Sequence, residues 1–464
     1  MDKHSIIKNA LEYFDRPDIR EQFEADLASL IAIDSVAGEA DGIYPYGKKA
    51  AEALEAALKL GERYGFATHN YEYHCGTITH GDAERDVGIV AHLDVVPCGG
   101  GWTYPPYQLT IDGDRYIGRG TEDDKGPFLI GLYVLRYFKE SGIELPFALK
   151  MIAGSDEEVG SSDLVYYSSV AKAPWFSFTP DSEFPVSIGE KNIVGLQVSL
   201  GGINSDIAYI TGGIVSNAVP DSAEAFVKTD RELHDADGIT VKKADGGFVI
   251  TALGRGAHAA MPETGINAIG VLADYLIANG YGCKSLELVS KACHSYLGEI
   301  LGIAHTDADF GYLTCVASMI RVENGEGKLV FNIRAIPGVN EDGMQDVIRH
   351  SLAQYGSDIV SFGINKGYRF SADDQKIISL CDACSFVLDK ECKPYTMGGG
   401  TYARELKNCV AFGAVLPEQY SDSDVGGAHQ RDERMKRSDM AKAFQIYVLS
   451  LLSLADGLEG GIID

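Results

Sequence analysis

Histidine and carboxylate side chains recur together along the chain at spacings that suit metal binding. The segment "AHLDVV" places His92 and Asp94 two residues apart, and "TPDSEFP" holds Asp181 between prolines. Residues i and i+2 of a β-strand face the same side, so Asp94 can accept the imidazole N–H of a metal-binding His92 and fix its tautomer. A structural histidine or a turn aspartate would account for either segment in isolation.

Three further clusters carry the same chemistry. Asp123 lies in "GRGTEDDKGP" at a predicted loop-to-helix junction, Glu157 and Glu158 adjoin in "GSDEEVGSSD", and His429 lies in the glycine-flanked "GGAHQRDE". Acids before a helix also favour its N-terminal dipole, and a loop histidine is often only solvated. Together, however, the five clusters supply the nitrogen and carboxylate ligands that divalent metals prefer. Five ligands with one shared carboxylate hold two ions about 3.5–4 Å apart.

The elements around these clusters predict an α/β layer. Apolar, β-branched runs end in polar residues in "DVGIVAHLDVVP", "PFALKMIAGSDEEVG" and "WFSFTPDSEFP", and a helix-like stretch, "KGPFLIGLYVLRYFKESG", separates the first two. Strands that alternate with helices indicate a buried, mainly parallel sheet flanked by helices. Function gathers where such strands end, and the acidic clusters lie there.

The chain changes character after about residue 190. Residues 191–372 mix strand-like runs such as "NIVGLQVSL" with helices such as "GINAIGVLADYLIANG", which indicates an inserted α+β lid domain with antiparallel strands. Residues 373–464 return to a helix, glycine-rich loops and a final apolar helix, "FQIYVLSLLSLADGL", predicted to be buried. We therefore predict a discontinuous catalytic domain of residues 1–190 and 373–464.

Composition excludes several classes of partner. Lys and Arg number 40 against 67 Asp and Glu, a formal charge of -27, which argues against nucleic acid and anionic membranes. The N-terminal segment lacks the features of a signal peptide, and no apolar stretch reaches the ~18 residues of a membrane span. Nine cysteines, an odd number, indicate reduced thiols and a cytoplasmic protein, and the "CDAC" pair at Cys381 and Cys384 fits a helix with core-facing thiols.

The ordered set of motifs resembles the di-zinc aminoacylase/carboxypeptidase/dipeptidase superfamily, and most closely its PepV-type bacterial dipeptidases. The resemblance extends over essentially the whole chain. It is carried by "HLDVVP", "GRGTEDDKGP", "SDEEVGSSD", "TPDSEFPVSIGEK", "NAVPDSAEA", "GRGAHAAMPETGINA", "FNIRAIPG", "GGGTYAR" and "HQRDE".

The resemblance implies a ligand set for two divalent ions. His92 and Asp181 would bind one ion, Glu158 and His429 the other, and Asp123 would bridge both. The peptide bond after Asp123 is expected to be cis. Zinc is the favoured metal, although manganese and cobalt accept the same ligands.

The resemblance also implies catalytic roles for two acids beside these ligands. Asp94 would orient His92, and Glu157 would be the general base. We expect extended backbone at Glu157 and Glu158, which would point the first at water and the second at a metal.

The lid would supply groups that hold the substrate. Asn217 and His258 would polarise the scissile carbonyl and stabilise the oxyanion, and Arg334 would clamp the substrate's carboxylate, helped by backbone N–H groups around Gly400 and Thr401. In isolation each would be explained as an ordinary turn, loop or strand residue.

The expected activity is hydrolysis of the peptide bond of short, free-ended peptides by a metal-bridged hydroxide. A lid of this size resembles the PepV type, in which one chain supplies contacts that smaller relatives obtain by dimerising, so we expect a monomer. The alternatives are an N-acyl-amino-acid deacylase of the same superfamily and a non-catalytic metal- or peptide-binding protein. Retention of Glu157 argues against the last.

Overall fold

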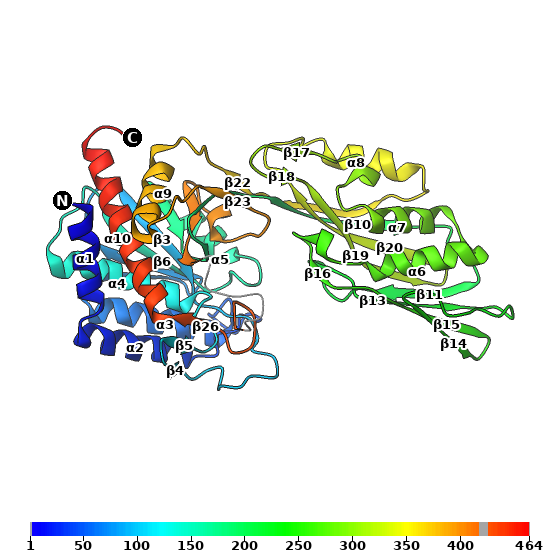
Figure 1. Cartoon of the computed structure of the whole chain (residues 1–464), viewed down its shortest axis with the longest axis horizontal. Coiled ribbons are helices and arrows are strands. Elements are labelled where there is room, and N and C mark those ends of the chain that lie inside the picture. The colour runs from blue at the N-terminus through cyan, green and yellow to red at the C-terminus, as the bar shows by residue number, and fades with distance from the viewer. Residues whose placement is uncertain (1, 417–425, 464) are drawn as a thin grey trace. The chain divides into compact units, whose positions relative to one another are not determined.

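A computed structural model describes residues 2–416 and 426–463, and the chain divides into two compact units (Figure 1). The first unit comprises residues 1–188, 370–395 and 401–464, and the second comprises residues 189–369 and 396–400. Gly400 thus belongs to the second unit and Thr401 to the first.

The first unit is built on a mixed sheet whose centre is parallel. Its strands lie in the order β1 (Ala67–Tyr71), β2 (Cys75–His80), β6 (Ala148–Gly154), β3 (Asp86–His92), β7 (Phe176–Thr179), β24 (Cys409–Phe412) and β9 (Val186–Glu190). Strands β6, β3, β7 and β24 run parallel, and β1, β2 and β9 add antiparallel edges. The predicted α/β fold class is confirmed. Strands β3, β6 and β7 are the predicted apolar runs, whereas β24 lies in residues 373–464, where only helices and glycine-rich loops were predicted.

Helices cover both faces of this sheet. They are α1 (Lys3–Phe14), α2 (Pro17–Ile31), α3 (Gly47–Arg63), α4 (Lys125–Ser141), α5 (Ser162–Val170), α9 (Gln375–Leu388) and α10 (Arg437–Glu459). Gly131 of α4 lies against Met151 and Ile89, whereas Gly154, three residues after Met151 on β6, faces Asp163 of α5. Because strand side chains alternate between faces, α4 and α5 lie on opposite sides.

The predicted buried terminal helix is confirmed in α10. Phe444 stacks on Phe14 of α1 with ring centroids 4.9 Å apart, and α10 runs beside α1 and α9 (Figure 1). Among the described residues, α10 is the one helix long and apolar enough to cross a membrane. However, 67% of its most apolar 18-residue segment is buried inside the structure. Its apolar residues therefore form core. The predicted helix around Cys381 and Cys384 is likewise confirmed in α9, where both thiols are free and buried.

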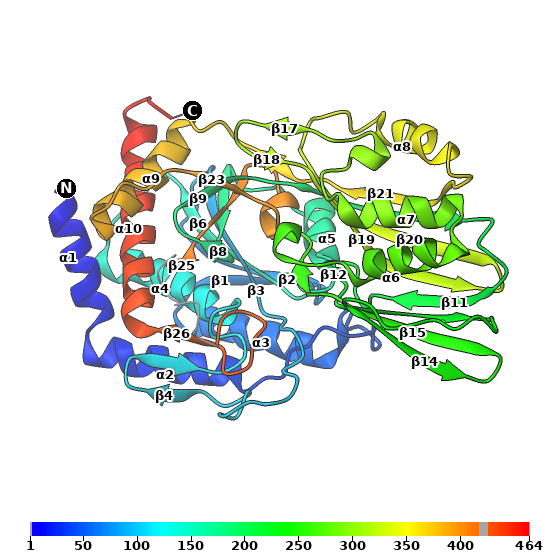
Figure 2. The same ribbon diagram turned by 45° about the vertical axis from the view of Figure 1, so that its right-hand side comes forward.

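The second unit is an antiparallel sheet with helices on one face (Figure 2). Its order is β14 (Ile239–Ala244), β15 (Gly247–Leu253), β13 (Ser222–Val227), β11 (Ile207–Gly212), β19 (Thr314–Glu323), β20 (Glu326–Ala335), β10 (Asn192–Leu200) and β21 (Ile359–Asn365). The helices are α6 (Ala268–Leu276), α7 (Lys284–His294) and α8 (Met344–Ala353). Buried residues of both layers form one core, which matches the predicted antiparallel α+β region.

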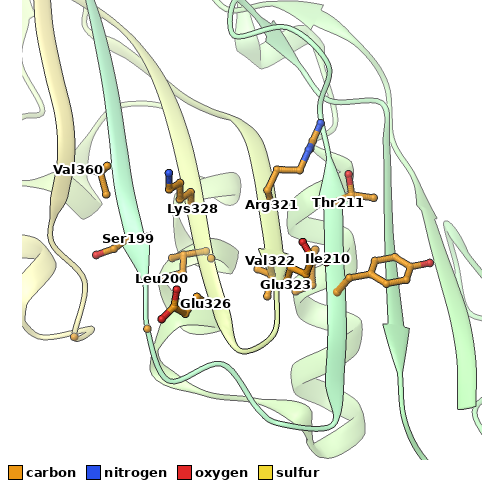
Figure 3. A pocket seen from close by; sticks show the side chains of 14 residues that line it. Ser199, Leu200, Ile210, Thr211, Arg321, Val322, Glu323, Glu326, Lys328 and Val360 are labelled. Carbon is orange, nitrogen blue, oxygen red and sulfur yellow. The ribbon is translucent and has the colours of Figure 1, made fainter. Parts of the chain in front are cut away.

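The open face of this second sheet carries a groove of about 710 Å³ (Figure 3). Tyr209, Thr211 and Arg321 line it together with Ile210, which also belongs to the core beneath the helices. Ile320, next to Arg321, belongs to that core and does not line the groove. The predicted substrate-binding residues are all described, and none of them lines this groove.

Short strands and turns complete both units. The first contains β4 (Thr110–Asp112), β5 (Arg115–Ile117), β8 (Ser182–Glu183), β25 (Ala414–Val415), β26 (Arg434–Lys436) and η4 (Tyr402–Arg404). The second contains β12 (Ala218–Val219), β16 (Ala257–His258), β17 (Thr306–Asp307), β18 (Gly311–Tyr312), β22 (Tyr368–Arg369), η1 (Pro262–Thr264), η2 (Ile277–Tyr281) and η3 (Glu299–Leu301), and β23 (Tyr395–Met397) begins where the units divide. Pairing of β5 with β26 brings the segment before Asp123 next to the segment after His429.

Candidate metal centre

The parallel strands bring three of the predicted ligands to one edge of the first sheet. His92 is the last residue of β3, Asp181 follows β7, and Glu158 lies in the loop after β6. Asp123 immediately precedes the N-cap of α4. The carboxyl ends of parallel strands share one edge, which is the usual position of functional groups in open α/β sheets.

The first ligand group joins His92, Asp123 and Asp181. The fully buried His92 places Nε2 2.8 Å from Asp123 Oδ1 and 3.9 Å from Asp181 Oδ2. All three ligand atoms lie within 4.8 Å of one another, a spacing that one ion can span.

The second group joins Asp123, Glu158 and His429. His429 Nε2 lies 3.0 Å from Asp123 Oδ2 and 3.1 Å from Glu158 Oε2. The two groups therefore share Asp123, each through a different carboxylate oxygen. The peptide bond between Asp123 and Asp124 is cis, as the resemblance implied.

The hydrogen bonding of these atoms fits metal ligation. His92 Nε2, Asp123 Oδ1 and Glu158 Oε1 are buried, and none makes a hydrogen bond of acceptable geometry. Buried polar atoms in proteins are nearly always satisfied. Three such atoms on the same ligand set, with His nitrogen and carboxylate oxygen combined, match what divalent cations of the zinc type take. The residues present therefore fit the implied ions.

The two histidines sit in strongly anionic surroundings. Burial opposes protonation of His92, but Asp123 and Asp94 outweigh it and raise its pKa well above the ordinary value. Hydrogen bonding to Asp123 and Glu158 raises the pKa of His429 to about 10. Divalent cations would provide the same compensation of charge for these carboxylates.

Glu157 and Asp181 show the electrostatic cost of crowding acids. Burial raises the pKa of Glu157 well above its usual value, and the charges of Glu158 and Asp123 add to the shift. Burial also raises the pKa of Asp181 well above its usual value, and the charges of Asp123 and Glu157 add to that shift. Glu157 thus lies among the predicted ligands without belonging to either group.

Asp94 makes contacts on both sides of the site. His92 Nδ1 lies 3.0 Å from the Asp94 backbone oxygen and 3.5 Å from Asp94 Oδ1. The two carboxylate oxygens of Asp94 accept the N–H groups of Glu157, at 3.2 Å, and of Glu158, at 3.1 Å. Asp94 therefore links the first ligand to the loop of the paired glutamates.

The expectation of extended backbone at Glu157 and Glu158 is wrong. Residues 157–160 form a turn, closed by Gly160 N donating to Asp156 O at 3.1 Å. Successive N–H groups of a strand point to opposite sides, so a strand could not present both to one carboxylate, as this turn does.

Two acids that sequence reasoning missed also hold ligand loops in place. Asp124 Oδ2 accepts the N–H of His92 at 3.2 Å. Asp163 Oδ2 accepts from Ser155 N at 2.6 Å and Asp156 N at 3.1 Å, and also from the Tyr402 hydroxyl. Each stands in a quoted motif, but acceptance of a backbone N–H leaves no spacing signal in the sequence.

The predicted substrate groups of the second unit gather within that unit. Strands β12 and β16 pair Ala218 with His258, and Asn217 O accepts Ala259 N at 2.9 Å. His258 Nδ1 accepts from Ala260 N at 3.2 Å, which leaves the proton on Nε2. Burial and the nearby charge of Arg334 lower the pKa of His258, so its neutral form is favoured.

Arg334 and Thr401 also have defined surroundings. Arg334, only 5% exposed, donates from Nε to Asn332 Oδ1 and from Nη1 to Gly398 O, both at 2.9 Å. In the first unit, the Thr401 hydroxyl accepts from Ala403 N at 3.1 Å and caps η4. These anchors fix the Arg334 guanidinium and the Thr401 side chain within their own units.

Comparisons with known proteins match most of the chain. The family model described as "Peptidase family M20/M25/M40" matches residues 88–453. The chain is 30% identical over 458 residues to the Beta-Ala-Xaa dipeptidase of Lactobacillus delbrueckii subsp. lactis, which covers 92% of this chain and 95% of that protein.

Two solved structures share the fold. Human carnosine dipeptidase 1 aligns with a TM-score of 0.58 at 16% identity, covering 97% of this chain and 99% of that one. The aminoacylhistidine dipeptidase from Vibrio alginolyticus aligns with a TM-score of 0.59 at 14% identity, covering 92% and 95%.

Proposed function

The chain belongs to peptidase family M20/M25/M40, and from that premise we propose that it is a metal-dependent dipeptidase acting on short peptides with free ends. The observation that carries the proposal is the pair of His/carboxylate groups sharing Asp123, with Glu157 beside them. Full-length similarity to a Beta-Ala-Xaa dipeptidase supports the choice of dipeptides as substrates.

The residues that would hold two divalent ions are His92, Asp123, Asp181, Glu158 and His429. Zinc is the favoured ion, and manganese or cobalt would suit the same donors. Such ions would polarise the scissile carbonyl and lower the pKa of water from 15.7 toward about 7.

Glu157 is the proposed general base. It takes a proton from the attacking water and later passes it to the leaving amine. Asp94 fixes the turn that carries Glu157 and Glu158 by accepting both of their N–H groups. A rigid turn keeps Glu157 at a fixed position relative to Glu158. Proton transfer needs such a fixed position, because it occurs only over hydrogen-bond distance.

The second unit supplies the proposed contacts to substrate. Neutral His258, with its proton on Nε2, can donate to a developing oxyanion, and Asn217 adds a second polar group from the adjoining segment. Arg334 is proposed to bind the substrate's C-terminal carboxylate, with the backbone around Gly400 and Thr401. We further propose that the protein acts as a monomer.

The test is a substrate panel with purified protein. Free dipeptides, their N-acetylated and C-amidated forms, and N-acetyl and N-succinyl amino acids are compared before and after chelation of metal. We expect cleavage of free dipeptides that stops on chelation and returns with zinc, manganese or cobalt. Release of acetate or succinate without dipeptide cleavage would instead identify a deacylase, and binding of metal without any turnover would identify a binding protein.

A further inference from the structure

Two loops of the first unit carry Asp123 and His429, two of the three residues in the second ligand group. Asp123 lies in the loop that follows β5, and His429 lies in the loop that precedes β26. The paired strands fix where the loops begin and end, with Ile117 opposite Arg434. Strand pairing alone does not fix the loop interiors, where the ligands lie.

Glu433 supplies a contact between the loop interiors. Its side chain is fully buried, and Oε1 accepts the N–H groups of Gly120 at 3.0 Å, Glu122 at 2.9 Å and Asp123 at 3.1 Å. Its backbone oxygen also accepts Gly118 N at 2.9 Å. One carboxylate thus holds three N–H groups of the Asp123 loop, including that of Asp123 itself.

A buried arginine compensates the charge of Glu433. Arg119 is 1% exposed, and its Nη1 donates to Glu433 Oε2 at 2.5 Å. The guanidinium also lies over the Trp102 ring, 5.2 Å from the centroid. An ionised pair is costly to bury unless further hydrogen bonds compensate for the lost water. Here three N–H groups of the Asp123 loop supply those hydrogen bonds, and the buried pair thereby fixes that loop.

Glu122 makes the reciprocal contact. It lies next to Asp123, and its Oε1 accepts the N–H of Ala428, the neighbour of His429, at 2.9 Å. Each loop therefore contributes a carboxylate that is not in either ligand group and that binds backbone beside a ligand of the other loop.

We propose that Glu433 and Glu122 are positioning residues that set the separation of Asp123 from His429 and so the affinity for divalent cations. The proposal rests on the metal centre of the proposed function but not on the substrate. Glu433 acts on the ligand shared by both ions, so its loss weakens both binding events. Glu122 acts on the His429 loop, so its loss weakens only the ion held by Asp123, Glu158 and His429.

The experiment titrates metal-free protein with Zn²⁺ in competition with a chromogenic chelator, at a temperature where circular dichroism shows every variant folded. Loss of groups that orient metal ligands typically lowers metal affinity about 10–100-fold. We expect that loss for both equivalents in Glu433→Ala, and a smaller one in Glu433→Gln, whose amide oxygen can still accept N–H groups. Glu122→Ala should weaken one equivalent only, and Glu122→Gln should restore it.

Asp26→Asn is the matched control. Asp26 is 2% exposed, pairs with Arg63 and accepts from two tyrosine hydroxyls, but lies on α2, outside both ligand loops. The Asp26→Asn variant should bind both equivalents of Zn²⁺ with the affinity of the wild type. An equal loss in Asp26→Asn would overturn the proposal, because the effect would then be general.

Wild-type affinity in folded Glu433→Ala would also overturn it. If Glu433→Ala does not fold, Glu122→Ala decides alone, and two unchanged equivalents in that variant refute the proposal. These measurements use no substrate, so a failure of the dipeptidase assay leaves them interpretable.

Discussion

Replacing Gly154 by alanine would press a methyl group into the support of the paired-glutamate turn. Gly154 ends β6, and a Cβ there would lie 1.9 Å from the Tyr402 hydroxyl oxygen and 2.5 Å from Asp163 Oδ2. Tyr402 is fully buried, so its ring cannot swing into solvent. The substitution must therefore separate Tyr402 from Asp163, and Asp163 holds the N–H groups of Ser155 and Asp156.

The size of the effect follows from these contacts. Overpacking a core costs about 1–3 kcal/mol, and loss of a hydrogen bond to a charged group costs about 1.5–3 kcal/mol, so we expect destabilisation of roughly 2.5–6 kcal/mol. At about 2 °C per kcal/mol for a domain of this size, the Tm of the first unit should fall by roughly 5–12 °C. Displacement of the turn should also weaken metal binding, because Glu158 moves with it.

Thermal unfolding followed by circular dichroism, together with zinc titration of the folded variant, provides the assay. Gly160→Ala is the matched control, because Gly160 lies in the same turn and a Cβ there would meet nothing within 4 Å. It should melt and bind zinc as the wild type does. If the Tm of Gly154→Ala equals that of Gly160→Ala, the role given to the Tyr402–Asp163 contact is refuted.

Three further predictions concern the proposed chemistry. Glu157→Gln should keep both metals and lose about 10²–10⁴-fold in kcat, whereas Glu158→Gln should lose bound metal, measured by elemental analysis; an equal fall in metal content would contradict the two roles. Chelation should lower the Tm as well as activity, since ligands at 100 times their Kd stabilise by about 2.7 kcal/mol, and an unchanged Tm on chelation would argue against the site. Arg334→Lys should raise KM for free dipeptides by roughly tenfold or more, because the guanidinium fork that binds the carboxylate is lost. The KM for C-amidated dipeptides should change little, and an equal rise for both substrates would contradict binding of the C-terminal carboxylate by Arg334.

The central fold could be predicted because its strands and helices carry strong local patterns. The apolar runs of β3 and β6 and the all-round apolar α4 are buried almost throughout, so composition alone distinguishes them. The edge strand β1, "ATHNY", is at most half-buried and shows no periodicity, and the sequence did not predict it. Its pairing depends on β2 beside it, which a local pattern does not encode.

The candidate site divides in the same way. His92, Asp123, Glu158, Asp181 and His429 could be predicted because their order along the whole chain resembles a family, and the structure gathers them. Glu433 and Asp163 could not, because each acts by accepting N–H groups whose positions only the folded backbone determines.

The ligands of the two ions come from very different lengths of chain, and this imposes an order on the maturation of the enzyme. His92, Asp123 and Asp181 lie within one continuous stretch, whereas His429, which completes the second ligand set, is 248 residues beyond Asp181. At about 5–20 residues per second, a ribosome needs roughly 12–50 s to cover that interval. A growing chain therefore contains all residues of the first ligand group well before those of the second. The second group is complete only once His429 has been added, shortly before α10 is synthesised.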